Sequence, residues 1–254
     1  MSDFAVSGES YDAFMGRYSR HLSPQLIDLA GVESGQRVLD VGSGPGALTV
    51  ELARRVGAEA VTAVDPSEDF VLAVRSRVPG ATVERASAEN LPLPDGQFDA
   101  ALAQLVVHFM ADPVAGLQEM GRVTRRGGSV AACVWDHSAG GSGPLTVYYE
   151  ALHELDPSRP NESERPGTRP GHLAELFAAA GFGELQQATL AVRVEHATFE
   201  DWWAPYELGV GPIAGVFAEL GPKRVAQLRD LCREALPPPP FTIDARAWAV
   251  CARA

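Results

Sequence analysis

The chain has 254 residues, 46% of them hydrophobic, which is enough to bury a sizeable core in one large domain or in one domain with an appended cap. Its 33 acidic and 21 basic residues give a net charge of −12, which argues against nucleic acid and anionic membrane surfaces as partners. No stretch approaches the roughly 18 apolar residues of a membrane helix, and the first residues show no signal-peptide pattern.

Strand and helix patterns alternate between residues 37 and 135. Ser67 and Asp112 stand where helix N-caps belong, and Gly127-Gly128 predicts the end of the helix that follows Asp112. Such alternation is typical of a parallel sheet with helices on both faces. Short apolar runs predict five buried strands, at 37–41, 60–65, 81–86, 98–105 and 129–135.

The pattern changes after Trp135. Residues 137–172 are predicted to form a long loop with one helical stretch near Leu145–Leu155. The remaining predicted elements are a helix closed by Gly181, a sixth strand at 185–196, a mainly helical segment at 199–236 with breaks at Gly211-Pro212 and Gly221-Pro222, and a last strand at 246–253. The chain is therefore predicted to be an α/β protein with a seven-stranded, mostly parallel sheet and a helical cap.

The three cysteines, Cys133, Cys232 and Cys251, form no CxxC pair. So sparse and odd-numbered a set favours buried thiols in a reducing compartment over disulfides or a zinc site. We therefore expect a cytoplasmic protein, and no other spacing in the sequence predicts a metal site.

The most informative segment is the glycine-rich loop in VLDVGSGPGALT, Val38–Thr49, between the first strand and the first helix. Its three glycines allow backbone to approach a ligand closely, and the helix offers free N–H groups. The GxGxG spacing and the preceding Asp40 suit an amine-bearing ligand better than the pyrophosphate of a dinucleotide. Asp65 ends the second strand, where a carboxylate can accept both hydroxyls of a ribose; the ribose of NAD and a cap on the next helix are the alternatives.

Four motifs occur in order: VLDVGSGPG, AVDPS, SAENLPLPDGQFDAALAQLVVHFM and RVTRRGG. Together they resemble the S-adenosylmethionine-dependent methyltransferases with a Rossmann-like sheet, and most of all the small-molecule methyltransferases related to the ubiquinone and menaquinone biosynthesis enzymes. The resemblance covers about residues 11–135, is weaker over 171–182 and RAWAV, and is nearly absent in the cap. It implies that S-adenosylmethionine is the cofactor and S-adenosylhomocysteine the product.

The resemblance also implies cofactor contacts. Asp40 would lie near the methionine amine, Asp65 would hold the ribose hydroxyls, and Gln104 would lie near the transferred methyl group. YDAFMGRYSRH is similar to the family's lid helix, in which an arginine such as Arg20 can pair the cofactor carboxylate; an amphipathic helix packed on the sheet is the alternative. The full predicted set is Tyr11, Arg20, Asp40, Gly42, Ser43, Gly44, Gly46, Asp65, Pro66, Ser87, Ala88, Glu89, Gln104 and Leu105.

One position departs from the family pattern. The family commonly has an aspartate before the Ala-Glu pair, where it reads the adenine amino group, and this chain has Ser87. A hydroxyl can still accept a hydrogen bond there, but without charge. This difference leaves open a catalytically silent domain that senses the cofactor.

Methyl transfer from a sulfonium is an in-line displacement whose rate depends mostly on alignment and exclusion of water. His108, after the fourth strand, is the candidate catalytic base, which an unactivated hydroxyl or a protonated amine would require. A packing histidine is the alternative. Aromatic residues are expected to line the acceptor-binding site, unless they form the core of the cap. These are Trp135, Tyr148, Trp202, Trp203 and Tyr206.

We expect a methyltransferase that acts on a small molecule, as a monomer or homodimer, with no metal, nucleic-acid or membrane partner. The alternatives are a silent cofactor-sensing domain and an NAD-dependent oxidoreductase; GxGxG, Asp40 and LPLPDGQFD argue against the second. The expected divisions are N-terminal lid helices (1–30), the cofactor-binding Rossmann-like core (31–136), a lid or insertion loop (137–172), more of the core (173–197), a helical substrate cap (198–240) and the last core strand (241–254).

Overall fold

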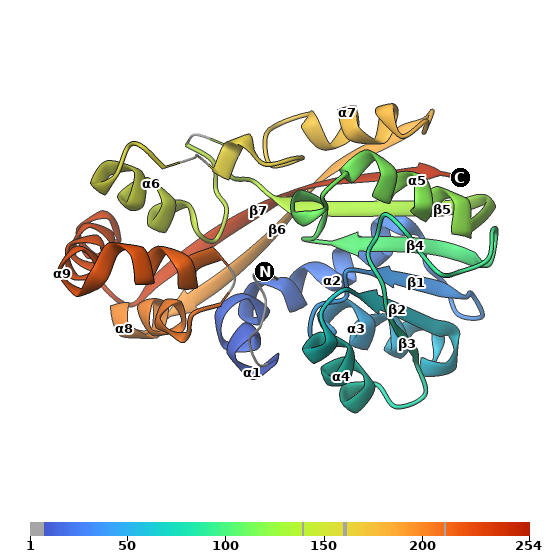
Figure 1. Ribbon diagram of the computed structural model, residues 1–254, viewed down its shortest axis with the longest axis horizontal. Coiled ribbons are helices and arrows are strands. Elements are labelled where there is room, and N and C mark those ends of the chain that lie inside the picture. Colours follow the sequence, from blue (N-terminus) through green and yellow to red (C-terminus); the bar gives the residue numbers. More distant parts are fainter. Residues whose placement is uncertain (1–7, 139, 160–161, 211) are drawn as a thin grey trace.

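The computed structural model describes residues 8–138, 140–159, 162–210 and 212–254. Its strands are β1 (Val38–Val41), β2 (Val61–Asp65), β3 (Thr82–Arg85), β4 (Phe98–Gln104), β5 (Thr124–Trp135), β6 (Leu185–His196) and β7 (Phe241–Arg253). They form one sheet in the order β3-β2-β1-β4-β5-β7-β6 (Figure 1). Pairing is parallel from β3 to β5 and antiparallel where β7 joins β5 and β6. The predicted seven-stranded, mostly parallel α/β fold is confirmed.

The strands are apolar on both faces because helices cover both. Successive side chains of a strand point to opposite faces, so Val38 and Leu39 of β1 belong to two different cores. The helices around the sheet are α2 (Arg17–Ala30), α3 (Ala47–Val56), α4 (Glu68–Arg77), α5 (Pro113–Val123) and α7 (His172–Ala179). Leu26 of α2 and Leu52 of α3 share the core of Val38, whereas Leu117 of α5 shares the core of Leu39.

The N-terminal segment is not one continuous α-helix. It consists of α1 (Gly8–Tyr11), a π-helical turn (Asp12–Gly16) and then α2. α2 packs across β4 and β5 and against β6, and α1 contacts α4, so this segment lies beside the end of the sheet where the glycine-rich loop is. Residues 1–7 of the predicted lid lie outside the described residues.

The cap is formed at the far ends of the long strands β6 and β7 (Figure 1). It contains α6 (Thr146–Leu155), α8 (Phe199–Trp203) and α9 (Pro212–Ala235). Gly221 has φ 71° and ψ 167° inside α9 and precedes Pro222, so the predicted break is present there as a kink. Residue 211, part of the other predicted break, lies outside the described residues. Short 3-10 segments complete the chain at Ala58–Ala60, Val107–Phe109, Glu162–Glu164 and Ala204–Leu208.

One local prediction is wrong, and another is confirmed only in its position. α5 begins at the predicted cap, where the Asp112 side chain accepts from the backbone N–H of Ala115, but it ends at Val123 rather than at Gly127-Gly128. These glycines belong to an irregular start of β5, where the register with β4 shifts. A Cβ at residue 128 would lie 2.6 Å from the carbonyl oxygen of Asp99, which explains a glycine in this bulge. Ser67 occupies the N-cap position of α4, but its side chain makes no capping hydrogen bond.

All three cysteines are free and buried, as predicted. None of the helices in the described part of the chain is long and apolar enough to cross a membrane. The described residues also contain no group of three or more histidine, cysteine or acidic side chains placed to hold a metal ion.

Candidate active site

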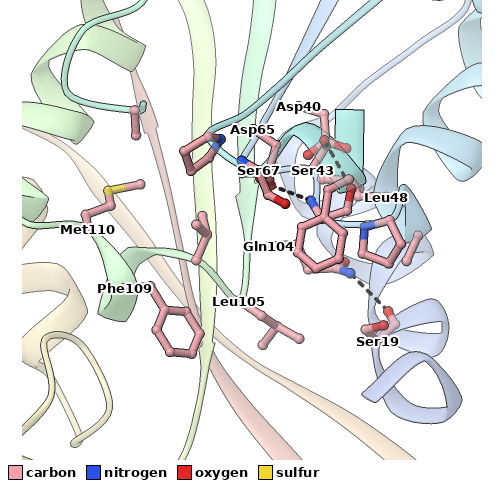
Figure 2. Close-up of a pocket in the computed structure, with 18 of the residues that line it drawn as sticks. Ser19, Asp40, Ser43, Leu48, Asp65, Ser67, Gln104, Leu105, Phe109 and Met110 are labelled. Atoms are coloured by element: carbon pink, nitrogen blue, oxygen red, sulfur yellow. Dashed lines mark hydrogen bonds between the residues drawn. The ribbon is translucent and has the colours of Figure 1, made fainter. Parts of the chain in front are cut away.

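A cavity of about 330 Å³ opens at the carboxyl ends of β1, β2 and β4. This is where ligands bind in open α/β sheets. Figure 2 shows Asp40, Ser43 and Asp65 on one side of the cavity and Phe109 and Met110 across from them. Of the predicted cofactor contacts, the lining contains Tyr11, Asp40, Gly42, Ser43, Gly44, Asp65, Pro66, Ser87, Ala88, Glu89, Gln104 and Leu105.

The glycine-rich loop has the backbone shape that its sequence predicts. Gly42 has φ +67°, and a Cβ there would lie 2.3 Å from Cγ2 of Val106. Only glycine therefore fits at residue 42. Gly44 has φ +52° but no atom within 4 Å of its would-be Cβ. Gly46 is not part of the lining; it precedes α3 with φ 100°, so it shapes the turn rather than the cavity wall.

Asp40 presents an unpaired carboxylate oxygen. The residue is 1% exposed, and its Oδ2 accepts a 2.6 Å hydrogen bond from the Thr49 hydroxyl. Its Oδ1 is buried and has no hydrogen-bond partner among the described residues. Burial raises the pKa of this carboxyl to about 7, against the lowering effect of the Thr49 hydrogen bond. A cationic donor beside Oδ1 would satisfy the orphaned oxygen and favour its ionised form.

Asp65 joins the glycine-rich loop to the turn before α4. Its Oδ2 accepts from the backbone N–H of Gly44 and its Oδ1 from the backbone N–H of Ser67, both at 2.8 Å. Burial raises the pKa of Asp65, and these two hydrogen bonds oppose the rise. The carboxylate does more than cap α4, because it connects two loops and lines the cavity. Each oxygen keeps a second lone pair for a ligand hydroxyl.

The prediction for Arg20 is not supported by the structure. Arg20 is exposed and absent from the lining, whereas its neighbour Ser19 lines the cavity. Gln104 donates through Nε2 to the Ser19 carbonyl at 3.1 Å, as Figure 2 shows. The hydroxyl of Ser19 and Oε1 of Gln104 are buried and have no partner in the described residues. Arg17 points elsewhere and pairs with Asp201 of the cap.

The charged residues of the lining are all acidic. They are Asp40, Asp65 and Glu89, and no lysine, arginine or histidine lines this cavity in the described part of the chain. Glu89 also holds the loop before α5, because its Oε1 accepts from the backbone N–H groups of Ala111 and Asp112. Such a lining suits a cation better than a phosphate.

The sequence prediction missed several apolar walls of the cavity, among them Leu48, Phe70, Phe109 and Met110. Phe109 and Met110 directly follow His108 in the third motif, so their position after β4 is enough to predict that they line the cavity. Leu105 was predicted as a cofactor contact, but its left-handed backbone conformation was not predicted. It has φ 62° and is the one described non-glycine residue with positive φ. Left-handed backbone in a leucine is strained, and such strain is concentrated at functional sites.

A second, smaller cavity of about 50 Å³ adjoins the first and shares Tyr11, Leu105 and Phe109 with it. His108 and Trp135, both predicted, line this second cavity. His108 is therefore beside the larger cavity and not inside it. The cap residues Leu145, Tyr149, Val210 and Ile213 also line the second cavity.

Four predicted acceptor contacts lie outside both cavities. Tyr148, Trp202, Trp203 and Tyr206 are each at most 3% exposed and line neither cavity. They pack on one another instead: the rings of Tyr148 and Tyr206 stack at 4.9 Å and those of Trp203 and Tyr206 at 5.6 Å. These aromatic residues form the core of the cap, the alternative that their burial favours.

Known proteins resemble this chain in sequence and fold. A family model described as a methyltransferase domain matches residues 39–132. The chain is 34% identical over 110 residues to the ubiquinone/menaquinone biosynthesis C-methyltransferase UbiE of Bdellovibrio bacteriovorus, covering 42% of this chain and 47% of that protein. It is 34% identical over 153 residues to a phosphatidylethanolamine N-methyltransferase of Cereibacter sphaeroides, covering 58% of this chain and 72% of that protein.

The match spans about half the length of other curated relatives that are 34% and 35% identical to this chain. Among solved structures, a SAM-dependent methyltransferase of Thermotoga maritima, described as a possible histamine N-methyltransferase, has a TM-score of 0.56 at 21% identity. That comparison covers 97% of this chain and 99% of the other, so the two share a fold.

Proposed function

The chain belongs to the S-adenosylmethionine-dependent methyltransferases with a Rossmann-like fold, and from that premise we propose that it transfers a methyl group from S-adenosylmethionine to a small-molecule acceptor. In this proposal the larger cavity binds the cofactor and the smaller one the acceptor. The predicted divisions into lid, core and substrate cap belong to the same proposal.

The observation that carries the proposal is the orphaned Oδ1 of Asp40 in a cavity whose charged residues are all acidic. S-adenosylmethionine has an ammonium and a sulfonium, and both suit such a lining. The ammonium would donate to Asp40, and the ribose hydroxyls would donate to Asp65. The pyrophosphate of NAD would meet the three carboxylates without a basic partner, so the oxidoreductase alternative is disfavoured.

When bound, the cofactor supplies a sulfonium-linked methyl group and leaves as a neutral thioether. The chain's own contribution is to align it and to exclude water. Gly42 and Gly44 give the ligand close access to backbone. Gln104 ends β4, and Leu105, which follows it, lines both cavities. His108 lies on the acceptor side of this junction, where a base would act.

The acceptor is proposed to be a small molecule because the second cavity is narrow and enclosed by the cap and core. The names of these two relatives specify a carbon acceptor in one protein and a nitrogen acceptor in the other, so they do not select the acceptor atom here. A cytoplasmic location remains part of the proposal and is consistent with three free, buried cysteines.

Transfer of an isotopically labelled methyl group tests the proposal against the silent alternative. The chain is incubated with methyl-labelled S-adenosylmethionine and a cell extract divided by ultrafiltration into small molecules and macromolecules. We expect label in the small-molecule fraction, and less of it with the Asp40→Asn variant at a cofactor concentration near the wild-type dissociation constant. Binding of the cofactor without transfer to either fraction would instead support a sensing domain.

A further inference from the structure

The second cavity holds polar groups that the fold leaves unsatisfied. Nδ1 of His108, Nδ1 of His137 and Nε1 of Trp135 are buried and have no hydrogen-bond partner among the described residues. These residues are 7%, 8% and 2% exposed, and all three line the same cavity. Buried polar groups in native proteins nearly always have partners, so three orphans around one cavity indicate a ligand that supplies them.

The two histidines form a pair at the cavity wall. Their ring centroids are 6.3 Å apart and their planes are close to perpendicular, at 80°. The other neighbours in the lining are largely apolar, including Phe14, Met15 and Ile213, and the carboxylate of Glu162, which also lines the cavity, is ion-paired with Arg165. The lining therefore suits a compact ligand, or the end of a longer one, that is apolar except for a polar group facing the imidazoles.

Both imidazoles are neutral at pH 7. Burial lowers the pKa of His137 to about 4 and that of His108 well below its ordinary value, and the positive charge of Arg165 acts in the same direction on both. Arg165 forms an ion pair with Glu162 and lies with its guanidinium carbon 5.4 Å from the centre of the Phe109 ring. A neutral imidazole accepts one hydrogen bond and donates another, so the pair suits an uncharged ligand group that can do both, such as a hydroxyl.

We propose that this cavity binds the methyl acceptor as an uncharged phenol or enol, with its hydroxyl hydrogen-bonded to His108 and its oxygen further contacted by Trp135 and His137. This inference rests on the proposed function and specifies its acceptor. Trp135 can only donate, so it is suited to the oxygen of the acceptor and not to an amine. A weakly basic imidazole removes an acidic phenolic or enolic proton more readily than the proton of an alkyl alcohol.

The acceptor oxygen forms a bond to the methyl carbon while the sulfur–methyl bond breaks, and that electron pair stays on sulfur. The hydroxyl proton moves to the free ring nitrogen of His108. The products are a methyl ether and a neutral thioether, and the proton on His108 later passes to solvent.

Binding of two matched probes tests the inference without turnover. 4-Nitrophenol and 4-nitroanisole differ only in the methyl group on the oxygen when the phenol is uncharged, so each is titrated by calorimetry, at a pH low enough to keep the phenol protonated, into the chain saturated with S-adenosylhomocysteine. We expect the phenol to bind about tenfold more tightly, the effect of one hydrogen bond to a buried partner. Benzylamine, a cation, should bind no better than the anisole.

Substitution of His108 tests whether the preference for the phenol over the anisole depends on this histidine. His108→Phe keeps a ring but removes its nitrogens, and should bring the two dissociation constants within about twofold of each other. His153→Phe makes the same exchange at an exposed histidine on α6 and should retain the full ratio. If His108→Phe does not fold, nitrogen-15 spectra of histidine-labelled wild-type protein replace it: 4-nitrophenol should shift two imidazole resonances that 4-nitroanisole leaves unchanged.

Equal binding of phenol and anisole to the wild type, or a preference that survives His108→Phe, would overturn this inference and leave the proposed function standing. Tight binding of benzylamine alone would replace a phenol with an amine as the acceptor class. Failure of S-adenosylhomocysteine to bind in the first place would remove the proposed function and, with it, the inference.

Discussion

Binding of a cationic ligand beside Asp40 should release a proton from its carboxyl group. The pKa of this carboxyl is about 7 in the free protein, because burial disfavours its charge. An ammonium at the unpaired Oδ1 would lower that pKa, so the complex holds fewer protons than the free protein. Affinity for S-adenosylmethionine should therefore rise with pH until Asp40 is ionised without the ligand.

The expected magnitude follows from a pKa of about 7. The carboxyl is about half ionised at pH 7 and about one-tenth ionised at pH 6, so affinity should fall about fivefold over this unit and about tenfold over the next. Calorimetry in two buffers with different ionisation enthalpies counts the protons: about half a proton should be released at pH 7 and about 0.9 at pH 6.

Two substitutions make the prediction specific. Asp40→Asn should weaken binding at pH 7 by about 1.5–3 kcal/mol, the value of a hydrogen bond to a charged group, and should abolish the pH dependence between pH 5.5 and 7. Asp69→Asn changes an exposed carboxyl on α4 and should keep the wild-type dependence. Equal wild-type affinity at pH 6 and pH 7 with no proton release, or an undiminished slope in Asp40→Asn, would refute the assignment of the amine to Asp40.

The other predictions concern neighbouring residues and the free protein. Asp65→Ala should weaken cofactor binding by about 1–3 kcal/mol in calorimetry, since it leaves ribose and backbone partners unpaired; an unchanged dissociation constant would contradict its role. Gly42→Ala should lower the melting temperature more than Gly44→Ala. Both glycines have positive φ, but only a Cβ at residue 42 meets another side chain, that of Val106. Equal losses of melting temperature would show that backbone strain alone decides the effect. His108→Ala should leave cofactor binding intact. Loss of that binding in calorimetry would contradict the assignment of His108 to the acceptor cavity. In the ligand-free protein, the folded pKa of Asp40 lies above its ordinary value of 3.8, so its stabilising contribution is full below about pH 4 and is lost as pH rises through about 7. Denaturant melts should show Asp40→Asn more stable than wild type at pH 8 by about 2–4 kcal/mol, and a less stable variant would contradict the raised pKa.

The parts of the site that the sequence predicted correctly are those fixed by local backbone. The glycine-rich loop follows β1 directly, and Asp40 and Asp65 stand at the ends of strands whose apolar runs are plain in the sequence. In a parallel sheet the carboxyl ends of neighbouring strands meet at one edge, so positions along the chain translate into positions in space. The order of motifs therefore predicted most of the cavity lining.

The errors have nonlocal causes. The π-helical turn at Asp12–Gly16 changes the phase of the helix that follows, so regular helical spacing does not tell which of Ser19 and Arg20 faces the cavity. The cap aromatic Tyr206 packs on Phe14 and Tyr148, which are distant in sequence, and composition alone does not separate a cap core from a ligand wall. The position of His137 beside His108 also has a nonlocal cause, because it depends on how the segment after β5 folds back onto the end of β4.

The most direct test of the cofactor site is a calorimetric titration of the chain with S-adenosylmethionine, S-adenosylhomocysteine and NAD side by side. The all-acidic charged lining and the unpaired Oδ1 of Asp40 predict binding of both adenosyl ligands, in the micromolar range of about −8 kcal/mol, and no binding of NAD. Binding of NAD alone, or of none of the three, would contradict the assignment of this cavity to S-adenosylmethionine.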